Sequence, residues 1–376
     1  MTSTLDQGLT HTIKPGTTIP SNETVTIRGG LVVFLGTLTV QEGARLIFEN
    51  CVLDTTALDQ DSVAFDLFDC QLEMQHCQFL KTPKSSDPFQ KTLTSVRTHG
   101  LCHIEAHHTH FDQTWNFATQ HADNACSLTF HHCTMTGGYD IFVADCYASF
   151  EHCIIENHRN CFAAFMIEMS MSYCLLSYAG SLLEATSMSL SYSNTGMAHF
   201  YQCHLTGLRA FENFAGVARS CTFTDLGYIE CNRGGIHDNM SPPSQFMGCQ
   251  FIFTRNISKF IPWMRYPSLV LGCSFLAQDE NPIRVRYGLI QASVERFNTH
   301  IENCRFYGLD TQTSFVILPS SFYQSDYGIA TVDNCRFYHI LNEHGQAIQT
   351  HANSHDPVHY EANVHVIHVS NSNING

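Results

Sequence analysis

Residues 146–155 read C-Y-A-S-F-E-H-C-I-I, and the pattern in this stretch recurs along most of the 376-residue chain. Counted from Cys153, apolar residues stand five and three positions before it (Ala148 and Phe150) and two positions after it (Ile155). Twelve positions act as anchors of this kind: Cys51, Cys77, Thr109, Cys133, Cys153, Cys174, Cys203, Cys221, Cys249, Cys273, Cys304 and Cys335.

Two columns of the repeat are apolar at every anchor. The residue two after the anchor is large and apolar in all twelve repeats, and the residue three before it is apolar in all twelve. The position four before the anchor is mostly polar. Alternation with a period of two is typical of a strand that buries one face. Each repeat therefore predicts two short strands.

The residue just before the anchor is expected to form a bend, because the inward positions change parity there. Asn, Gly and His dominate this column, and these residues tolerate positive φ angles better than most. The column consists of Asn50, His76, His108, His132, His152, Tyr173, Gln202, Ser220, Gly248, Gly272, Asn303 and Asn334. A bend in every repeat indicates the coil of a solenoid.

The repeat predicts an all-β fold, a single-stranded right-handed parallel β-helix of the pectin-lyase-like kind with about twelve coils and capped ends. The anchors are spaced irregularly, from 18 residues (Cys203 to Cys221) to 32 residues (Cys77 to Thr109). Helical repeats are excluded because the apolar spacing is two. Irregular loops on coils of this length favour the β-helix over a leucine-rich repeat.

The chain is expected to have three segments, because the open ends of a β-helix need a cover against edge pairing. They are an N-terminal arm and cap (1–45), the parallel β-helix (46–340) and a C-terminal cap (341–376), with one more strand at 364–369. The variable spacing predicts inserted loops at 81–97, 182–197, 229–243, 277–297 and 308–328.

The cysteines are expected to be buried free thiols. There are 17 of them, an odd number, and no C-x-x-C occurs. A small buried thiol behaves as a hydrophobic residue, and unpaired thiols indicate a reducing compartment. If Cys153 is selected only for its size, replacing it by Ser should cost roughly 1–3 kcal/mol for the extra buried polar group.

Composition argues against two classes of partner. Lys and Arg number 19 against 34 Asp and Glu, which gives a net charge of −15 and little material for a basic, nucleic-acid-binding face. No apolar run reaches the roughly 18 residues of a membrane span. The N-terminal residues also lack the features of a secretory signal. We therefore expect neither nucleic acid nor membrane as a partner.

No catalytic residue, cofactor or metal is predicted, and the chain is expected not to be an enzyme. Enzymes of this shape that cleave sugars place carboxylates on neighbouring coils of one face. Asp145 and Glu168 stand in columns whose other members are not acidic. A site built from loops, or between subunits, stays open.

The histidines of the bend column allow two interpretations. His76, His108, His132 and His152 fall on four consecutive repeats, and His107 and His131 stand next to two of them. They form a metal-binding or pH-sensing ladder, or they serve as bend residues whose rings stack. Stacked imidazoles resist simultaneous charging, which should lower their pKa and make stability fall below about pH 6.5.

The phrases around several anchors resemble a known family. E-N-C-R-F-Y (302–307), D-N-C-R-F-Y (333–338), S-C-T-F (220–223) and H-C-Q-F (76–79) are similar to those of the adenoviral β-helix family. That family includes a minor capsid protein of atadenoviruses and the large early-region transforming protein of mammalian adenoviruses. Length and charge balance fit the capsid branch better, since the chain lacks a long disordered N-terminal region and an acidic, cysteine-rich tail.

The resemblance implies a structural protein. It implies a tailspike-like homotrimer that forms a knob on the virion surface, stabilises the capsid and is assembled in the host nucleus. Residues 341–376 would then also be a trimerisation segment, and the N-terminal arm would anchor the knob to other capsid proteins. A contact with a host receptor or glycan is left open by the resemblance.

Outward apolar residues are candidates for the trimer face, namely Trp115, Phe117, Tyr201 and Tyr228.

Two other functions stay open. One is a tailspike-like β-helix that binds or cleaves a polysaccharide, and the other is an intracellular interaction scaffold.

Overall fold

The computed structural model of the chain describes residues 2–5, 9–58, 63–80, 96–112, 117–120, 126–136, 140–142, 146–156, 160–177, 187–208, 210–231, 243–255, 263–278, 282–285, 288–293, 299–312, 315–320, 329–343, 345–349 and 366–373. All long-range regular structure in these residues is β-strand. None of them belongs to a helix long and apolar enough to cross a membrane. The chain forms two compact units, Met1–Met197 and Ala198–Gly376, and the boundary falls within β21 (Ser187–Tyr201).

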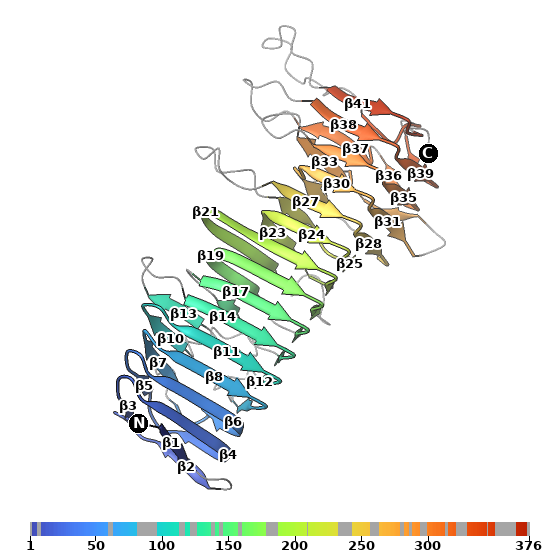
Figure 1. The fold of residues 1–376 in the computed structure, drawn as a ribbon. Helices are drawn as coiled ribbons and strands as arrows, with labels where there is room; N and C mark the ends of the chain where they lie inside the picture. The colour runs from blue at the N-terminus through green and yellow to red at the C-terminus, as the bar shows by residue number, and fades with distance from the viewer. Residues whose placement is uncertain are drawn as a thin grey trace. The chain divides into compact units, whose positions relative to one another are not determined.

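The first unit consists of three rows of parallel strands (Figure 1). The row before the bends contains β4 (Thr24–Phe34), β6 (Arg45–Asp54), β8 (Gln71–Gln75), β11 (His103–His107), β14 (Cys126–His131), β17 (Cys146–Glu151) and β19 (Asn160–Ser172). The row after the bends contains β9 (Gln78–Leu80), β12 (His110–Asp112), β15 (Thr134–Thr136), β18 (Ile154–Glu156) and β20 (Leu175–Ser177), and β4 and β6 run through the bend into it. The third row contains β3 (Thr18–Ile19), β5 (Leu38–Val40), β7 (Phe65–Phe68), β10 (Val96–His99) and β13 (Phe117–Gln120), while β16 (Asp140–Phe142) pairs with the start of β19.

The second unit repeats this arrangement. The row before the bends contains β24 (Gly216–Arg219), β27 (Ser244–Met247), β30 (Leu269–Leu271), β34 (His300–Glu302), β38 (Ile329–Asp333) and β41 (Val366–Ser370). The row after the bends contains β22 (His204–Thr206), β25 (Thr222–Thr224), β28 (Gln250–Phe253), β31 (Ser274–Ala277), β35 (Arg305–Tyr307) and β39 (Arg336–Tyr338). The remaining strands are β23 (Ala210–Phe214), β26 (Ile229–Cys231), β29 (Met264–Arg265), β33 (Ile290–Ser293) and β37 (Ile317–Ser320), and the small sheet of β32 (Ile283–Arg284), β36 (Leu309–Gln312) and β40 (Leu341–Asn342).

Equivalent positions of successive repeats lie side by side. Ile104 on β11 is in register with Leu72 on β8 and with Leu128 on β14, and the pairing is parallel in both cases. A chain that returns in the same direction to the next position of the same sheet has completed one coil. The all-β parallel β-helix predicted from the repeat is therefore confirmed in each unit.

The two ends of the chain, residues 1–45 and the strand predicted at 364–369, can be compared with the structure. Coils begin before residue 46, because β1 (Thr2–Leu5) and β2 (Thr10–Ile13) pair in parallel with β4, and β4 pairs with β6. The residues predicted as an arm thus contain paired strands. The strand expected at 364–369 is present as β41, which pairs with β38.

Several predicted loops contain strands of the third row. β26 lies in the loop predicted at 229–243, β33 in that at 277–297 and β37 in that at 308–328. β26, β33 and β37 were missed because they are short and stand at variable distances from the anchors. The longer strand β21 also occupies much of the loop predicted at 182–197. Most of the loop predicted at 81–97 lies outside the described residues.

The inward columns form the core of both units. In β6 the inward residues Leu46, Phe48, Cys51 and Leu53 are buried, and Asn50 between them is exposed. Phenylalanines two after the anchors stack face to face, as in Phe275–Phe306 and Phe306–Phe337, whose ring centroids lie 4.8 and 4.7 Å apart. Each fully buried Phe contributes roughly 1.5–3 kcal/mol of hydrophobic free energy.

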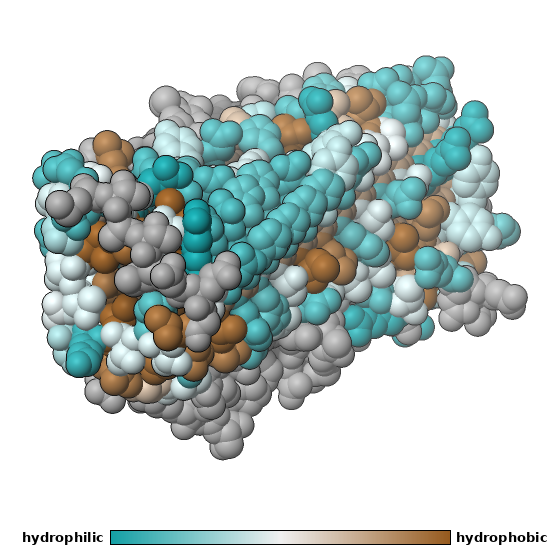
Figure 2. All heavy atoms as spheres, turned by 60° about the horizontal axis from the view of Figure 1, so that its bottom comes forward, coloured by the Kyte–Doolittle hydropathy of each residue, from teal (hydrophilic) through white to brown (hydrophobic). Residues whose placement is uncertain are grey.

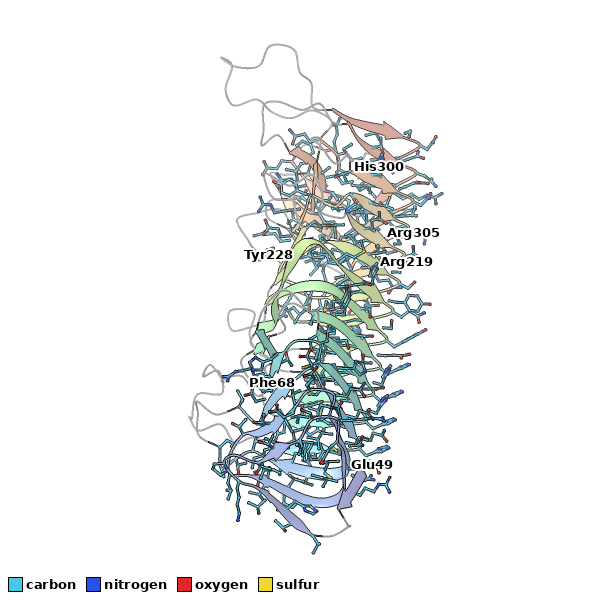
Figure 3. The ribbon with its side chains drawn as sticks, turned by 60° about the vertical axis from the view of Figure 1, so that its left-hand side comes forward. Glu49, Phe68, Arg219, Tyr228, His300 and Arg305 are labelled. Atoms are coloured by element: carbon cyan, nitrogen blue, oxygen red, sulfur yellow. The ribbon has the colours of Figure 1, made fainter. Side chains whose placement is uncertain are left out.

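Outward positions carry the polar residues. Hydrophilic side chains form rows on the face seen in Figure 2, and Figure 3 shows the side chains of Glu49 and Arg305 directed away from the ribbon. The bends separate these rows. All twelve predicted bend residues have positive φ, from 47° at Asn334 to 62° at Gly272.

Candidate functional site

The anchor column is a ladder of buried thiols. The sixteen cysteines whose side chains the structure describes are free thiols, and all of them are buried. The predicted column is Cys51, Cys77, Cys133, Cys153, Cys174, Cys203, Cys221, Cys249, Cys273, Cys304 and Cys335. The Cys153 thiol donates to the backbone oxygens of Phe130 and Glu151, each at 3.4 Å. Thr109 occupies the same place, and its hydroxyl donates to the oxygens of Met74 and His107 at 3.5 and 3.0 Å.

The protonated thiol is favoured at two of the core cysteines, the anchor Cys153 and Cys126. Contacts with the thiols of Cys133 and Cys174, together with burial, raise the pKa of Cys153 far above its usual value. Burial raises the pKa of Cys126 to about 12. A thiolate is the nucleophilic form of cysteine. These two positions therefore serve packing and hydrogen bonding rather than covalent chemistry.

The bend column forms an aromatic ladder in the first unit. The ring centroids of His76 and His108 lie 4.9 Å apart, and those of His108 and His132, and of His132 and His152, lie 4.8 Å apart. Tyr173 continues the stack at 4.7 Å from His152. Desolvation first, and then the charges of His132, His76 and His107, lower the pKa of His108. The ring stacking expected of bend histidines is thus present.

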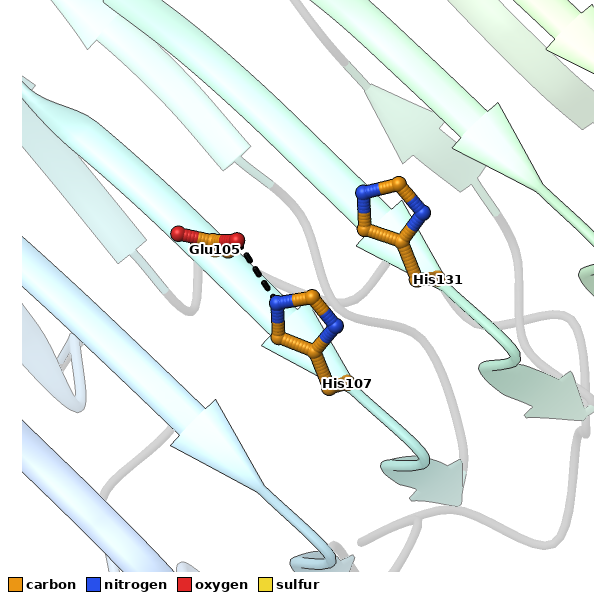
Figure 4. A group of neighbouring side chains, drawn as sticks. All are labelled: Glu105, His107 and His131. Carbon is orange, nitrogen blue, oxygen red and sulfur yellow. Dashed lines mark hydrogen bonds and ion pairs between the residues drawn. The ribbon is translucent and has the colours of Figure 1, made fainter.

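A second group of ionisable residues lies beside this ladder on β11. His103, Glu105 and His107 alternate along the strand and share its outward side. His107 Nε2 lies 2.6 Å from Glu105 Oε1 (Figure 4), and His103 Nε2 lies 3.6 Å from Glu105 Oε2. The hydrogen bond with His107, and then the charges of His107 and His103, lower the pKa of Glu105. Glu105 is therefore a carboxylate held between imidazoles.

The neighbouring strands extend this group. His131 on β14 is in register with His107, and the two rings stack with centroids 4.9 Å apart. His131 Nδ1 lies 3.0 Å from Glu151 Oε2 on β17. One potential ligand atom each from Glu105, His107 and His131 lies within 4.8 Å of the others. The arrangement suits binding of a proton or of a cation that prefers nitrogen ligands.

Glu73 on β8 does not belong to the group, although it is in register with Glu105. Its two oxygens accept hydrogen bonds from Arg45, with Nε at 2.6 Å and Nη2 at 2.8 Å. This bidentate pair fixes Glu73 on the side away from the histidines. The residues that gather around His107 are thus Glu105 and His131. We call Glu105, His107 and His131 the imidazole–carboxylate cluster.

Sequence reasoning found only part of this cluster. It placed His107 and His131 next to the bend column but did not connect them with Glu105. The spacing E-x-H on a strand puts both side chains on one face, and this was the available signal. Glu168, whose column was predicted to contain no other acidic residue, is in register with Tyr147 in the structure.

The candidate trimer-face residues have different outcomes. Tyr201 is exposed and Tyr228 is half-buried. Trp115 lies outside the described residues, and the side chain of Phe117 is not described. Asp145 also lies outside the described residues.

The phrases that carry the family resemblance are structural units. In E-N-C-R-F-Y, Asn303 forms the bend, Cys304 and Phe306 are buried, and Arg305 and Tyr307 are exposed. No protein family matches the chain in a scan of family profiles, and no curated protein is significantly similar to it. The resemblance to the adenoviral β-helix family accordingly rests on these phrases.

Proposed function

We propose that the chain is a structural virion protein that assembles as a homotrimeric, tailspike-like knob, as the adenoviral β-helix family does. One observation carries the proposal. Each residue of the recurring N/H-C-x-F phrase has a packing role in the coil: the first forms the bend, the cysteine bonds backbone oxygens and the phenylalanine stacks in the core. Every position of the phrase that resembles the family therefore has a packing role in the scaffold.

Outward apolar residues on the first unit support a subunit interface. Tyr147 on β17 is 47% exposed and Ile154 on β18 is 39% exposed, and both residues belong to the same coil. Tyr173, at the next bend, is 45% exposed. Exposed aromatic side chains are favoured at the centre of protein interfaces. Closed cyclic symmetry would bury the same patch on each of three copies.

The remaining parts of the proposal follow from charge and resemblance. A net charge of −15 favours protein neighbours over nucleic acid. The neighbours proposed are other capsid proteins, and the location proposed is the virion surface after assembly in the host nucleus. In this role the coils form a scaffold that presents a surface to other proteins, and no catalytic step is required.

Light scattering of purified protein tests the interface. The wild-type chain should have the mass of three chains, and the double variant Tyr147→Glu/Ile154→Glu should shift toward the mass of one. Tyr338→Glu, an equally exposed tyrosine of the second unit, is the matched control and should leave the trimer intact. A trimer that survives the double variant would move the interface elsewhere, and a monomeric wild type would reject the proposal.

A carbohydrate-binding role is a second candidate, favoured by one surface of the second unit. Arg305 and Arg336 are in register on β35 and β39, and so are Tyr307 and Tyr338. All four side chains are exposed. Paired guanidinium groups suit an acidic group, and tyrosine faces suit a sugar ring. Titration with sulfated and neutral oligosaccharides tests this, since only the sulfated one should bind and Arg336→Gln should abolish binding.

A further inference from the structure

We propose that Glu105, His107 and His131 form a binding site for a divalent transition-metal cation of the zinc type. This goes beyond the proposed structural role and does not depend on it. The three residues combine two imidazoles and one carboxylate, a donor set that Zn²⁺, Ni²⁺ and Cu²⁺ prefer over Mg²⁺ or Ca²⁺. The site lies wholly within the first unit.

The backbone places the three ligands together without help from a loop. Glu105 and His107 share one face of β11, and His131 stands in register with His107 on β14. Their candidate ligand atoms lie within 4.8 Å of one another. Ligands of a tetrahedral zinc lie about 2.0–2.2 Å from the ion, so side-chain rotations are sufficient to close the site.

A positioning residue prepares one ligand. His131 Nδ1 contacts Glu151 Oε2 at 3.0 Å, and a carboxylate there favours the tautomer that carries its proton on Nδ1. Nε2 of His131 then has a free lone pair. Figure 4 shows the rings of His107 and His131 parallel and similarly oriented beside Glu105. Nε2 of His107 also lies on the side of the carboxylate, where it holds the hydrogen bond with Glu105 Oε1 at 2.6 Å, and a bound cation would take the place of that hydrogen bond.

The His107 and His131 rings stack with their centroids 4.9 Å apart. A single cation that binds both rings would also satisfy the carboxylate of Glu105. With three protein ligands, the fourth position of a tetrahedral ion would hold water, as in an open zinc site.

Calorimetric titration of the EDTA-stripped full chain with Zn²⁺ tests whether the site binds a metal ion. The visible absorption spectrum of bound Co²⁺ reports the coordination geometry. One site should be saturated, with the visible spectrum of a four-coordinate Co²⁺ ion and a raised unfolding temperature. Glu151→Gln should weaken binding by about 10- to 100-fold, and His107→Gln and His131→Gln at least as much. All three residues point outward, and melting curves without metal verify that each variant folds.

His300→Gln is the matched control. His300 is an exposed strand histidine of the second unit whose Nδ1 bonds Thr331 Oγ1 at 2.6 Å, and its loss should leave the affinity unchanged. The proposal is overturned if the wild-type chain shows no saturable site, or if His107→Gln/His131→Gln binds Zn²⁺ as tightly as the wild type. Sedimentation of the same samples distinguishes the test of metal binding from the test of the trimer, because removal of the metal should leave the sedimentation of the protein unchanged.

Discussion

At the scale of single residues, the anchor cysteine has two physical roles where the sequence indicated one. Its size was evident from the column, but its hydrogen bonds to two backbone oxygens were not. Thr109, the one anchor that is not cysteine, explains why the column accepts a hydroxyl, because it makes the same pair of contacts. The selection is therefore for a small side chain that also donates a hydrogen bond.

This changes the expectation for Cys153→Ser. A hydroxyl that donates to the oxygen of Phe130 or Glu151 is not left unpaired, so we expect a loss of about 1 kcal/mol, near the worth of one buried hydrogen bond. Cys153→Ala removes both the donor and the volume of the sulfur and should cost at least as much. Urea unfolding of the three proteins gives the order, and a serine variant clearly less stable than the alanine variant would show that the hydroxyl finds no acceptor.

The bend residue supplies a second test at this scale. His152 has a φ of 52°, a region that costs a residue with a Cβ atom roughly 1–2 kcal/mol. We expect His152→Val to destabilise the fold by about 1–3 kcal/mol, because β-branched residues suit this conformation least. His152→Asn, which copies the bends at Asn50 and Asn303, should be close to neutral. Equal thermal midpoints for the two variants would contradict the account of the bend.

At the scale of the element, the histidine ladder is a stack of rings whose members affect each other's charge. His108 lies between His76 and His132, and its pKa is lowered by desolvation and by both neighbours, and also by His107. At the end of the ladder, Glu151 Oε1 lies 3.9 Å from His152 Nε2. The centre of the ladder is thus its most acid-sensitive part.

The sign of the resulting pH dependence follows from linkage. A histidine whose folded-state pKa lies below its unfolded value gives stability that is complete above about pH 6.5 and is lost as the pH falls toward the folded pKa. The thermal midpoint, measured with EDTA present, should therefore decrease from pH 7.5 to pH 5. His108→Asn should reduce this decrease because it removes the titrating imidazole. Asn occupies other bends, so the variant should keep the bend conformation. A midpoint that stays flat over this range in the wild type would contradict the prediction.

The elements also show why sequence reasoning found two strands of each coil and missed the third. The strands flanking the bend have fixed distances from the anchor, so their columns align in the sequence. Third-row strands such as β26 and β37 are three or four residues long and follow loops of variable length. Their pairing is set by tertiary contacts with the neighbouring coil, which no local pattern reveals. The pairing of Glu105 with His107 was in principle readable from the strand period, whereas the contact of His131 with Glu151 required the register between strands.

At the scale of the whole molecule, the repeat predicted the parallel architecture. The parallel coils follow from burial columns that each repeat contributes. The division at residues 197 and 198 has no counterpart in those columns. β1 and β2, which lie before residue 46, lack the anchor cysteine that marks later repeats.

The central claim, a structural trimer, is tested most directly by sedimentation equilibrium of the full chain over a hundredfold range of dilution. A protein built for a permanent assembly should have the mass of three chains at every concentration, because an obligate trimer does not dissociate under conditions where its subunits stay folded. A folded chain with the mass of one subunit throughout the range would contradict the claim.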